Sequence, residues 1–300
     1  MKLDKALLQE LTVRPKHPAG LDTRSTESTT GDWLGASKNR YKKVAEKDLE
    51  SFVDELSNVQ RLFWANGTHA LLIILQAMDA AGKDGTIRHV MSGVNPQGCD
   101  VEAFREPSAE DLEHDFLWRA AKVLPRRGMI KIFNRSYYEE VLVVRVHPEL
   151  LTRADAAAGT HQSASVWRDR YDDINAFEHH LHRNGTRIIK IFLHLSRDEQ
   201  KRRLLDRLDN PDKNWKFSAN DLAERKHWDD YQAAYEEALT TTSTPWAPWY
   251  VVPADHKYAL RALVGGIIVN SINDMELRPP QLSSAERDAL ARARDELLTE

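Results

Sequence analysis

The chain has 300 residues, of which 41% are hydrophobic and 29% charged, and its formal net charge at pH 7 is -4. This composition suits a large α/β core, argues against disorder and gives no sign of general nucleic-acid binding. No run of about 18 apolar residues could span a bilayer, and the start, MKLDKALLQELTVRPKHPAG, lacks a secretory signal, which predicts a cytoplasmic protein without a membrane partner. The single cysteine, Cys99, excludes an intramolecular disulfide and a zinc site of several thiolates, and we expect a packed thiol.

The N-terminal part of the chain is predicted to be an arm followed by a helix. Residues 1–40 are mostly polar and contain the run TRSTESTTGDW, so we expect an extended arm or loop that wraps the surface rather than a domain. Apolar residues then recur at helical spacing over 42–64, which predicts an amphipathic helix that ends near Asn66-Gly67.

An apolar run from Ala70 leads into a Gly82-Lys83 turn and then into helix-competent sequence that extends to Arg88. The run has the length of a buried parallel strand. A loop after such a strand aims backbone N–H groups and the positive end of a helix dipole at an anion, and Lys83 adds a full charge. The stretch is therefore predicted to be a strand, a phosphate-binding loop and a helix N-terminus.

Strand and helix patterns alternate along the rest of the chain. Apolar runs predict strands at 101–104, 129–133, 186–196 and 249–255. Helical patterns occupy 85–91, 109–124 with Ser108 as N-cap, 164–184, 197–208 and 218–239, and the apolar segment 260–274 closes the core. This alternation predicts a mostly parallel, doubly wound sheet flanked by helices.

Two polar features follow predicted apolar elements. Asn134, Arg135 and Ser136 come just after a strand, at the carboxyl end where open parallel sheets bind their ligands. Near the C-terminus, Ser283 and Glu286 form the capping box of a last, charged helix. The first feature predicts a ligand-binding site at the end of a strand, and the second predicts the start of a helix.

The loop departs from the phosphate-loop pattern G-x-x-x-x-G-K-[ST] at two positions. Gly82 and Lys83 are in place, whereas Ala77 replaces the first glycine and Asp84 replaces the hydroxyl residue. A Gly-Lys step alone could be a structural turn, but the strand before it and the helix after it favour phosphate binding. Asp79 has no evident packing role and would be well placed to hold Mg²⁺, which takes oxygen ligands and bridges phosphates.

Arginines in the predicted helix 197–208 form a second basic cluster. Arg203 and Arg207 are four residues apart and would share a face, from which they could reach over phosphates as a lid with Arg202 beside them. The alternative is a solvated helix in which neighbouring acids pair with these arginines. Arg88 is either a further phosphate ligand or a surface residue.

Three segments, MDAAGKDGTIRHVMSGVNPQG, FNRSYYEEVLVVRVHPE and WKFSANDLAERKHWDDY, resemble the polyphosphate kinase 2 family over about 21–272. These enzymes move phosphoryl groups between inorganic polyphosphate and nucleotides. The resemblance implies a P-loop kinase-like catalytic domain over 41–278 with a helical lid at about 197–228, preceded by the arm (1–40) and followed by a C-terminal helix (279–300). It also implies Mg²⁺ dependence and a homodimer or homotetramer.

The resemblance assigns roles to matching positions. Asp79 corresponds to the metal-associated acid, Lys83 to the loop lysine and Arg135 to the arginine after the second motif's strand, and with Glu139 they form the predicted catalytic set. It also favours phosphate contact for the two lid arginines. The predicted phosphate-binding residues are Ala80, Ala81, Gly82, Lys83, Asp84, Gly85, Arg88, Arg203 and Arg207.

The FNRSYYE segment differs from the FDRSWYNR-like form of the family because Asn134 stands in place of an aspartate. An asparagine offers a carbonyl oxygen but no negative charge, and Glu139 would supply that charge. The predicted metal ligands are therefore Asp79, Asn134 and Glu139. The FNRSYYE form resembles the subgroup that phosphorylates AMP as well as ADP, so both acceptors are expected, with guanine nucleotides left open.

Transfer between phosphoanhydrides needs no protein nucleophile, because the attacking phosphate oxygen is already ionised at neutral pH. It needs charge neutralisation and in-line positioning of two anions. We therefore predict a reversible, Mg²⁺-dependent polyphosphate:nucleotide phosphotransferase. The alternatives are an ATP-dependent nucleotide or small-molecule kinase and a non-catalytic polyphosphate- or nucleotide-binding module.

Overall fold

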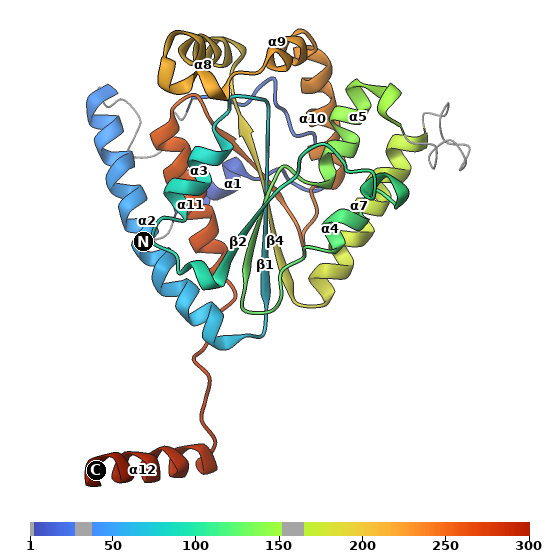
Figure 1. The fold of residues 1–300 in the computed structure, drawn as a ribbon. Coiled ribbons are helices and arrows are strands. Elements are labelled where there is room, and N and C mark those ends of the chain that lie inside the picture. Colours follow the sequence, from blue (N-terminus) through green and yellow to red (C-terminus); the bar gives the residue numbers. More distant parts are fainter. Residues whose placement is uncertain (1–2, 28–37, 152–164) are drawn as a thin grey trace.

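The computed structural model describes residues 3–27, 38–151 and 165–300; part of the predicted arm (28–37) and Ala164, the predicted first residue of a helix, lie outside them. A five-stranded sheet in the order β2-β3-β1-β4-β5 forms the centre (Figure 1). All of its strand pairs are parallel, which confirms the predicted sheet. The strands are β1 (Ala70–Ala77), β2 (Cys99–Ala103), β3 (Ile130–Asn134), β4 (Thr186–His194) and β5 (Trp249–Pro253).

Strand β1 lies at the centre of the sheet, and every one of its residues is buried. Leu71 and Ile73 enter the core on one face, and Leu72 and Ile74 enter the core on the other. A strand buried on both faces requires a continuous apolar run, and this is the pattern that predicted it. The chain leaves β1 toward β2 and β3 on one side and places β4 and β5 on the other, so the end of β1 adjoins a topological switch point.

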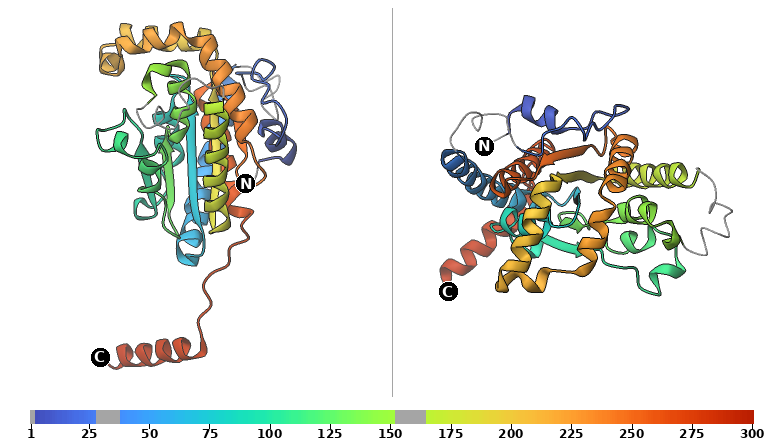
Figure 2. Two further views of the ribbon diagram at one scale, coloured as in Figure 1. Left: turned by 90° about the vertical axis from the view of Figure 1, so that its right-hand side faces the viewer. Right: turned by 90° about the horizontal axis from the view of Figure 1, so that it is seen from above.

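Helices cover both faces of the sheet, as Figures 1 and 2 show. On one face, α11 (Lys257–Asn273) packs closely at Gly266 against the segment before α1 (Lys5–Leu11), and a Cβ there would lie 2.5 Å from Leu3 Cγ. No helix in the described ranges is long and apolar enough to cross a membrane. One face carries α2 (Lys38–Asn66), α3 (Lys83–Val90) and α11 (Lys257–Asn273), and the other carries α7 (Ser165–Arg183) and α10 (Trp228–Thr242).

The sheet ends on one side at β2, which carries acidic side chains. Lys131 of β3 forms ion pairs with Asp100 and Glu102 of β2. Charges on an edge strand disfavour pairing with a strand of another molecule. Cys99 packs against the core, and burial raises the pKa of its thiol to about 11, which confirms the predicted packed thiol.

The N-terminal arm is not wholly extended as predicted, because α1 (Lys5–Leu11) forms a short helix. After it, the Val13 N–H donates to the Trp249 carbonyl at 2.8 Å, which places the arm along β5. Farther on, the Leu21 N–H donates to the Glu236 carboxylate of α10 at 2.8 Å. The described part of the arm is thus attached to the domain by buried apolar residues and by these hydrogen bonds.

The lid, which we define as α8 (Arg197–Asp209), η6 (Pro211–Lys216) and α9 (Ala219–Lys226), lies over the carboxyl ends of the strands (Figure 1). The prediction of one helix over 218–239 is wrong, because α9 ends at Lys226 and α10 begins at Trp228. His227 between them has ψ 23°, and its N–H closes a tight turn on the Glu224 carbonyl. The tight turn separates the lid from the buried helix α10.

The predicted helix over 109–124 is also wrong, because only η3 (Asp111–Glu113) and α4 (Trp118–Ala121) are helical there. Ser108 Oγ accepts the Asp111 N–H at 3.1 Å, and the Asp115 carboxylate accepts the Leu117 N–H at 2.9 Å. Such local side-chain bonds compete with the helical ladder. The Asp115 turn therefore divides the segment.

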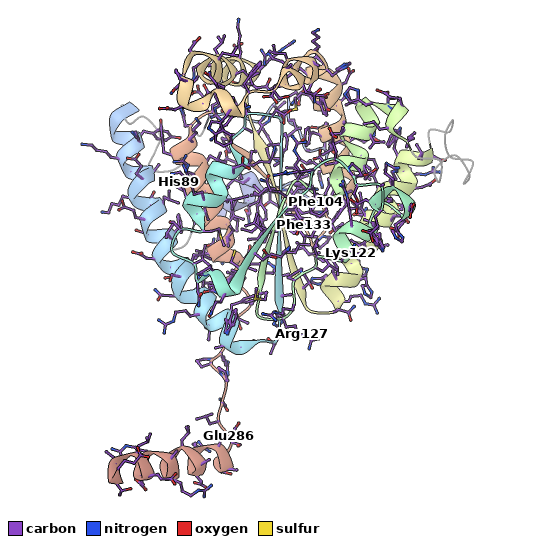
Figure 3. The ribbon with its side chains drawn as sticks, viewed as in Figure 1. His89, Phe104, Lys122, Arg127, Phe133 and Glu286 are labelled. Atoms are coloured by element: carbon purple, nitrogen blue, oxygen red, sulfur yellow. The ribbon has the colours of Figure 1, made fainter. Side chains whose placement is uncertain are left out.

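The last helix, α12 (Ser284–Thr299), begins with the predicted capping box, in which Ser283 and Glu286 bond reciprocally. All of its residues are exposed. It lies away from the sheet at the end of an extended segment, as Figures 1 and 3 show, where Glu286 is labelled. In Figure 3 the labelled Phe104 and Phe133 instead mark the core beside β3, where their rings meet edge to face at 4.8 Å.

Candidate active site

The phosphate loop connects Ala77, the last residue of β1, to Lys83, the first residue of α3. Gly82 has φ +103°, a conformation that other residues rarely adopt, and it forms the N-cap of α3. Ala80 also has a positive φ, 62°. The first-turn N–H groups of α3 have no partners within the helix and lie at its positive end, so the loop has the local structure of an anion site.

Lys83 folds back over this loop. Its Nζ donates to the Ala77 carbonyl at 3.1 Å. Burial lowers the pKa of the Lys83 ammonium to about 8, and the positive charge of Arg135 contributes to this shift. A bound phosphate would replace water around the ammonium and favour its charged form.

Arg135 lies between two carboxylates. One guanidinium nitrogen is 2.7 Å from Asp79 and the other is 3.5 Å from Glu139. The Glu139 charge raises the pKa of Arg135 against the opposing effect of burial, and Asp79 adds to the rise. Its backbone has φ 63°, and its N–H donates to the Leu75 carbonyl of β1 at 3.0 Å. The end of β1 thus fixes the segment that follows β3.

Asn134 is the last residue of β3 and pairs with Leu75 in the register of the sheet. Its amide Nδ2 donates to the Asp84 carboxylate at 2.6 Å. Asp84 is in the first turn of α3, so this bond joins the second motif to the phosphate loop. The structure therefore brings together the six predicted residues Asp79, Lys83, Asp84, Asn134, Arg135 and Glu139.

The donor set of the site fits Mg²⁺. Asp79 and Glu139 supply carboxylate oxygens on two sides of Arg135, and Asn134 supplies an amide oxygen. Mg²⁺ is usually held by one or two protein carboxylates together with phosphate oxygens and water. Among the described residues no three His, Cys, Asp or Glu side chains form a metal cluster.

Arg203 occupies a different position from the predicted one. It is 4% exposed, and its five N–H groups all donate to protein acceptors. One terminal nitrogen donates to the Ala80 and Ala81 carbonyls at 3.2 and 2.7 Å, the other donates to the carbonyls of 254–255, and Nε donates to Glu199 at 2.7 Å. The Arg203 side chain therefore binds backbone carbonyls of the phosphate loop and has no N–H group free to bind a phosphate.

The other predicted arginines differ from one another. Arg207 donates to the Asp221 carboxylate at 2.8 Å and so joins α8 to α9. Arg202 is exposed and forms a bidentate pair with Glu199, as the solvated-helix alternative predicted. Arg88 is exposed on α3.

The comparison with known families agrees with this geometry. The model of the family described as polyphosphate kinase 2 matches residues 38–280. The chain belongs to the polyphosphate kinase 2 family. The matched range contains the whole sheet, the phosphate loop and the lid, and it leaves α1 and α12 outside.

Relatives from several bacteria place the chain within this polyphosphate kinase 2 family. A protein of Rhodopseudomonas palustris named ADP-polyphosphate phosphotransferase is 52% identical over 87% of this chain and 89% of its own length. A protein of Meiothermus ruber named AMP/ADP-polyphosphate phosphotransferase is 46% identical over 81% and 87%. The crystal structure of polyphosphate kinase 2 from Arthrobacter aurescens has a TM-score of 0.82 and 39% identity, covering 94% of this chain and 95% of that one. The P-loop kinase-like fold is thereby established.

One cation that was not predicted, Arg261 of α11, lies beside the first turn of α3 in this polyphosphate kinase 2 member. A guanidinium nitrogen of Arg261 lies 3.7 Å from the position of a Cβ on Gly85. Burial and the charge of Arg88 lower the pKa of Arg261. A signal was present in the sequence, because Arg261 and Lys257 are the two charged residues of helix α11.

A buried ion pair stabilises the segment that follows β3. Lys190 of β4 and Glu178 of α7 are fully buried and 2.6 Å apart. The hydroxyls of Tyr137 and Tyr138 donate to the same Glu178 carboxylate at 2.9 and 2.8 Å. These tyrosines come directly after Arg135 and Ser136, so the network fixes the segment that carries Arg135 and Glu139.

Proposed function

We propose that this chain catalyses reversible, Mg²⁺-dependent phosphoryl transfer between inorganic polyphosphate and nucleotides, with AMP and ADP as acceptors. The observation that carries the proposal is the grouping of Lys83 and Arg135 with the Asp79 and Glu139 carboxylates at the ends of β1 and β3, in a member of the polyphosphate kinase 2 family. This grouping joins cations for phosphate to oxygen ligands for a metal at one edge of the sheet.

The chain's own residues would act mainly through charge and position. The Lys83 ammonium and the loop N–H groups would bind the transferring phosphate, and Arg135 would bind a neighbouring phosphate oxygen. Two anions that repel each other would thus be held in line for attack by an ionised phosphate oxygen. A general base is not required, because the attacking oxygen carries no proton at neutral pH.

Asp79, Glu139 and the Asn134 amide oxygen are the residues that would hold Mg²⁺. When bound there, the ion would neutralise charge on the reacting phosphates. In the structure Arg135 contacts both carboxylates, at 2.7 and 3.5 Å. Arg135 would therefore share these acids with the metal and fix their orientation.

The names of the relatives support both acceptors. The Rhodopseudomonas palustris relative is named for ADP, and the Meiothermus ruber relative, 46% identical, is named for AMP and ADP. A relative from Corynebacterium glutamicum, 31% identical, carries the name putative GDP-polyphosphate phosphotransferase. Guanine nucleotides are for this reason included in the test.

Initial rates with AMP, ADP, GMP and GDP test donor and acceptor together. Purified protein with polyphosphate and Mg²⁺, free of ATP, is expected to form ADP from AMP and ATP from ADP. Product that forms only when ATP is the donor would favour an ATP-dependent kinase instead. An Asp79→Asn variant separates an enzyme from a binding module: turnover is expected to be lost with the fold intact, whereas the exposed control Asp54→Asn is expected to retain it.

Two further properties belong to this proposal. We propose a homodimer or homotetramer, which family resemblance supports, and light scattering on the purified chain measures its molar mass. We also propose a cytoplasmic location, which a free thiol at Cys99 and nucleotide substrates support. A monomeric mass at the concentrations used for activity would contradict the first property.

A further inference from the structure

Three consecutive carbonyls of the phosphate loop accept hydrogen bonds from a single helix of the lid. Gln200 Nε2 donates to the Asp79 carbonyl at 3.0 Å. Arg203 donates to the Ala80 and Ala81 carbonyls at 3.2 and 2.7 Å. Both side chains come from α8 and are buried, with 1% and 4% exposed.

These bonds determine which way the peptide dipoles of the loop point. A carbonyl oxygen aimed at a phosphate would repel it, whereas an N–H aimed at it attracts it. The three carbonyls point toward α8. A phosphate bound on the side of the loop away from α8 would therefore not face these carbonyl oxygens. The bonds also hold Ala80 at φ 62°, which is unfavourable for a residue with a Cβ.

Gln200 has a second partner, which extends the connection to α9. Its Oε1 accepts a hydrogen bond from Arg225 at 2.7 Å, and the same Arg225 nitrogen donates to the Arg197 carbonyl at 2.9 Å. Both ends of the Gln200 amide are therefore used. The chain of contacts runs from Arg225 in α9, through Gln200 in α8, to the backbone of Asp79.

We propose that Gln200 and Arg203 are positioning residues of the phosphate loop, and that the Arg225–Gln200–Asp79 chain couples the lid to the acid that would hold the metal. The proposal rests on the proposed function for its kinetic consequences. It differs from the sequence-based role of Arg203, which was direct contact with phosphate. Gln200 had no predicted role.

The variant Gln200→Met tests the proposal, because methionine fills a similar volume and makes neither hydrogen bond. We expect kcat to fall by about 10-fold to 100-fold, since small displacements of a catalytic group have effects of this size. The Mg²⁺ concentration for half-maximal rate should rise, while KM for the nucleotide changes by less than about threefold. The exposed control Gln281→Met should leave all three values unchanged.

A double-mutant cycle with Arg225→Ala tests the connection itself, and Arg225 lies nearer the surface. The single variant should reduce kcat less than Gln200→Met does. Combining both changes should cost less than the sum of the two single losses, because the Arg225–Gln200 bond is already absent in Gln200→Met and only the other contacts of Arg225, such as its bond to the Arg197 carbonyl, remain to be lost. Additive losses, or an unchanged Mg²⁺ dependence in Gln200→Met, would overturn the proposal. Should Gln200→Met fail to fold, an Arg225→Ala variant with wild-type kcat and Mg²⁺ dependence would overturn it.

Hydrogen exchange without substrate separates this inference from the proposed function. The amides of 79–85 should exchange faster in Gln200→Met than in the wild type, whether or not the protein transfers phosphate. Faster exchange in a protein without polyphosphate activity would refute the function and leave the positioning role. Unchanged exchange and unchanged kcat in an active enzyme would refute the positioning role alone.

Discussion

At the scale of single residues, the charge state of Lys83 gives a pH prediction. Burial, with help from Arg135, lowers its pKa to about 8, so the side chain is an ammonium ion below that pH and a neutral amine above it. Because binding of phosphate uses the charged form, kcat/KM for polyphosphate should be highest below about 8 and then fall by about tenfold for each pH unit. A profile that stays flat to about pH 9.5 at saturating Mg²⁺ would contradict this role.

Arg135 permits a second prediction at this scale. Its guanidinium contacts Asp79 and Glu139 at once, which a lysine ammonium cannot reproduce with the same planar geometry. We expect Arg135→Lys to lower kcat by about 10²-fold or more, as the loss of one preorganised donor does in other enzymes. Steady-state rates measure this, with the exposed Arg61→Lys as a matched control. Activity close to that of the control would show that charge alone suffices.

The residues of the loop could be predicted from sequence because their signals are local. Gly82 and Lys83 are adjacent, and Asn134 and Arg135 directly follow a strand. The roles of Gln200 and Arg203 could not be predicted, because their acceptors in the phosphate loop lie more than a hundred residues away in the chain. A charged helix gives the same pattern whether its arginines face solvent, phosphate or a carbonyl.

At the scale of elements, the buried pair of Lys190 and Glu178 ties β4 to α7 and to the tyrosines after Arg135. Removing one partner leaves an uncompensated buried charge. Lys190→Met should therefore lower the free energy of unfolding by about 3–5 kcal/mol. Denaturant unfolding measures the change, and Lys47→Met, at an exposed position in α2, serves as the control. A loss similar to that of the control would contradict this role of the Lys190–Glu178 pair.

Long apolar patterns predicted elements better than polar ones did. The strands β1, β3, β4 and β5 and the helices α2, α7 and α11 follow continuous or periodic apolar residues. The segments 109–124 and 218–239, which are rich in charged residues, were each predicted as a single helix, but Asp115 and the turn at His227 divide them. These interruptions depend on individual hydrogen bonds and backbone angles, which a periodic pattern does not contain.

At the scale of the whole molecule, catalysis should not depend on α12. Its residues are all exposed, and the family match ends at residue 280. A chain that ends at Pro280 should keep kcat/KM within about twofold and its free energy of unfolding within about 0.5 kcal/mol. Activity assays and light scattering on both chains test this. A large loss of activity would mean that α12 contributes to the site of another copy.

The proposed function requires that the groups at the ends of β1 and β3 act in phosphoryl transfer from polyphosphate. The most direct measurement is nucleotide formation from AMP or ADP with polyphosphate and Mg²⁺, without added ATP, by the wild type, by Lys83→Ala and by the exposed control Lys43→Ala. We predict ADP and ATP from the wild type and the control and no product from Lys83→Ala. A wild type that forms no product, or a Lys83→Ala variant as active as the control, would contradict the account.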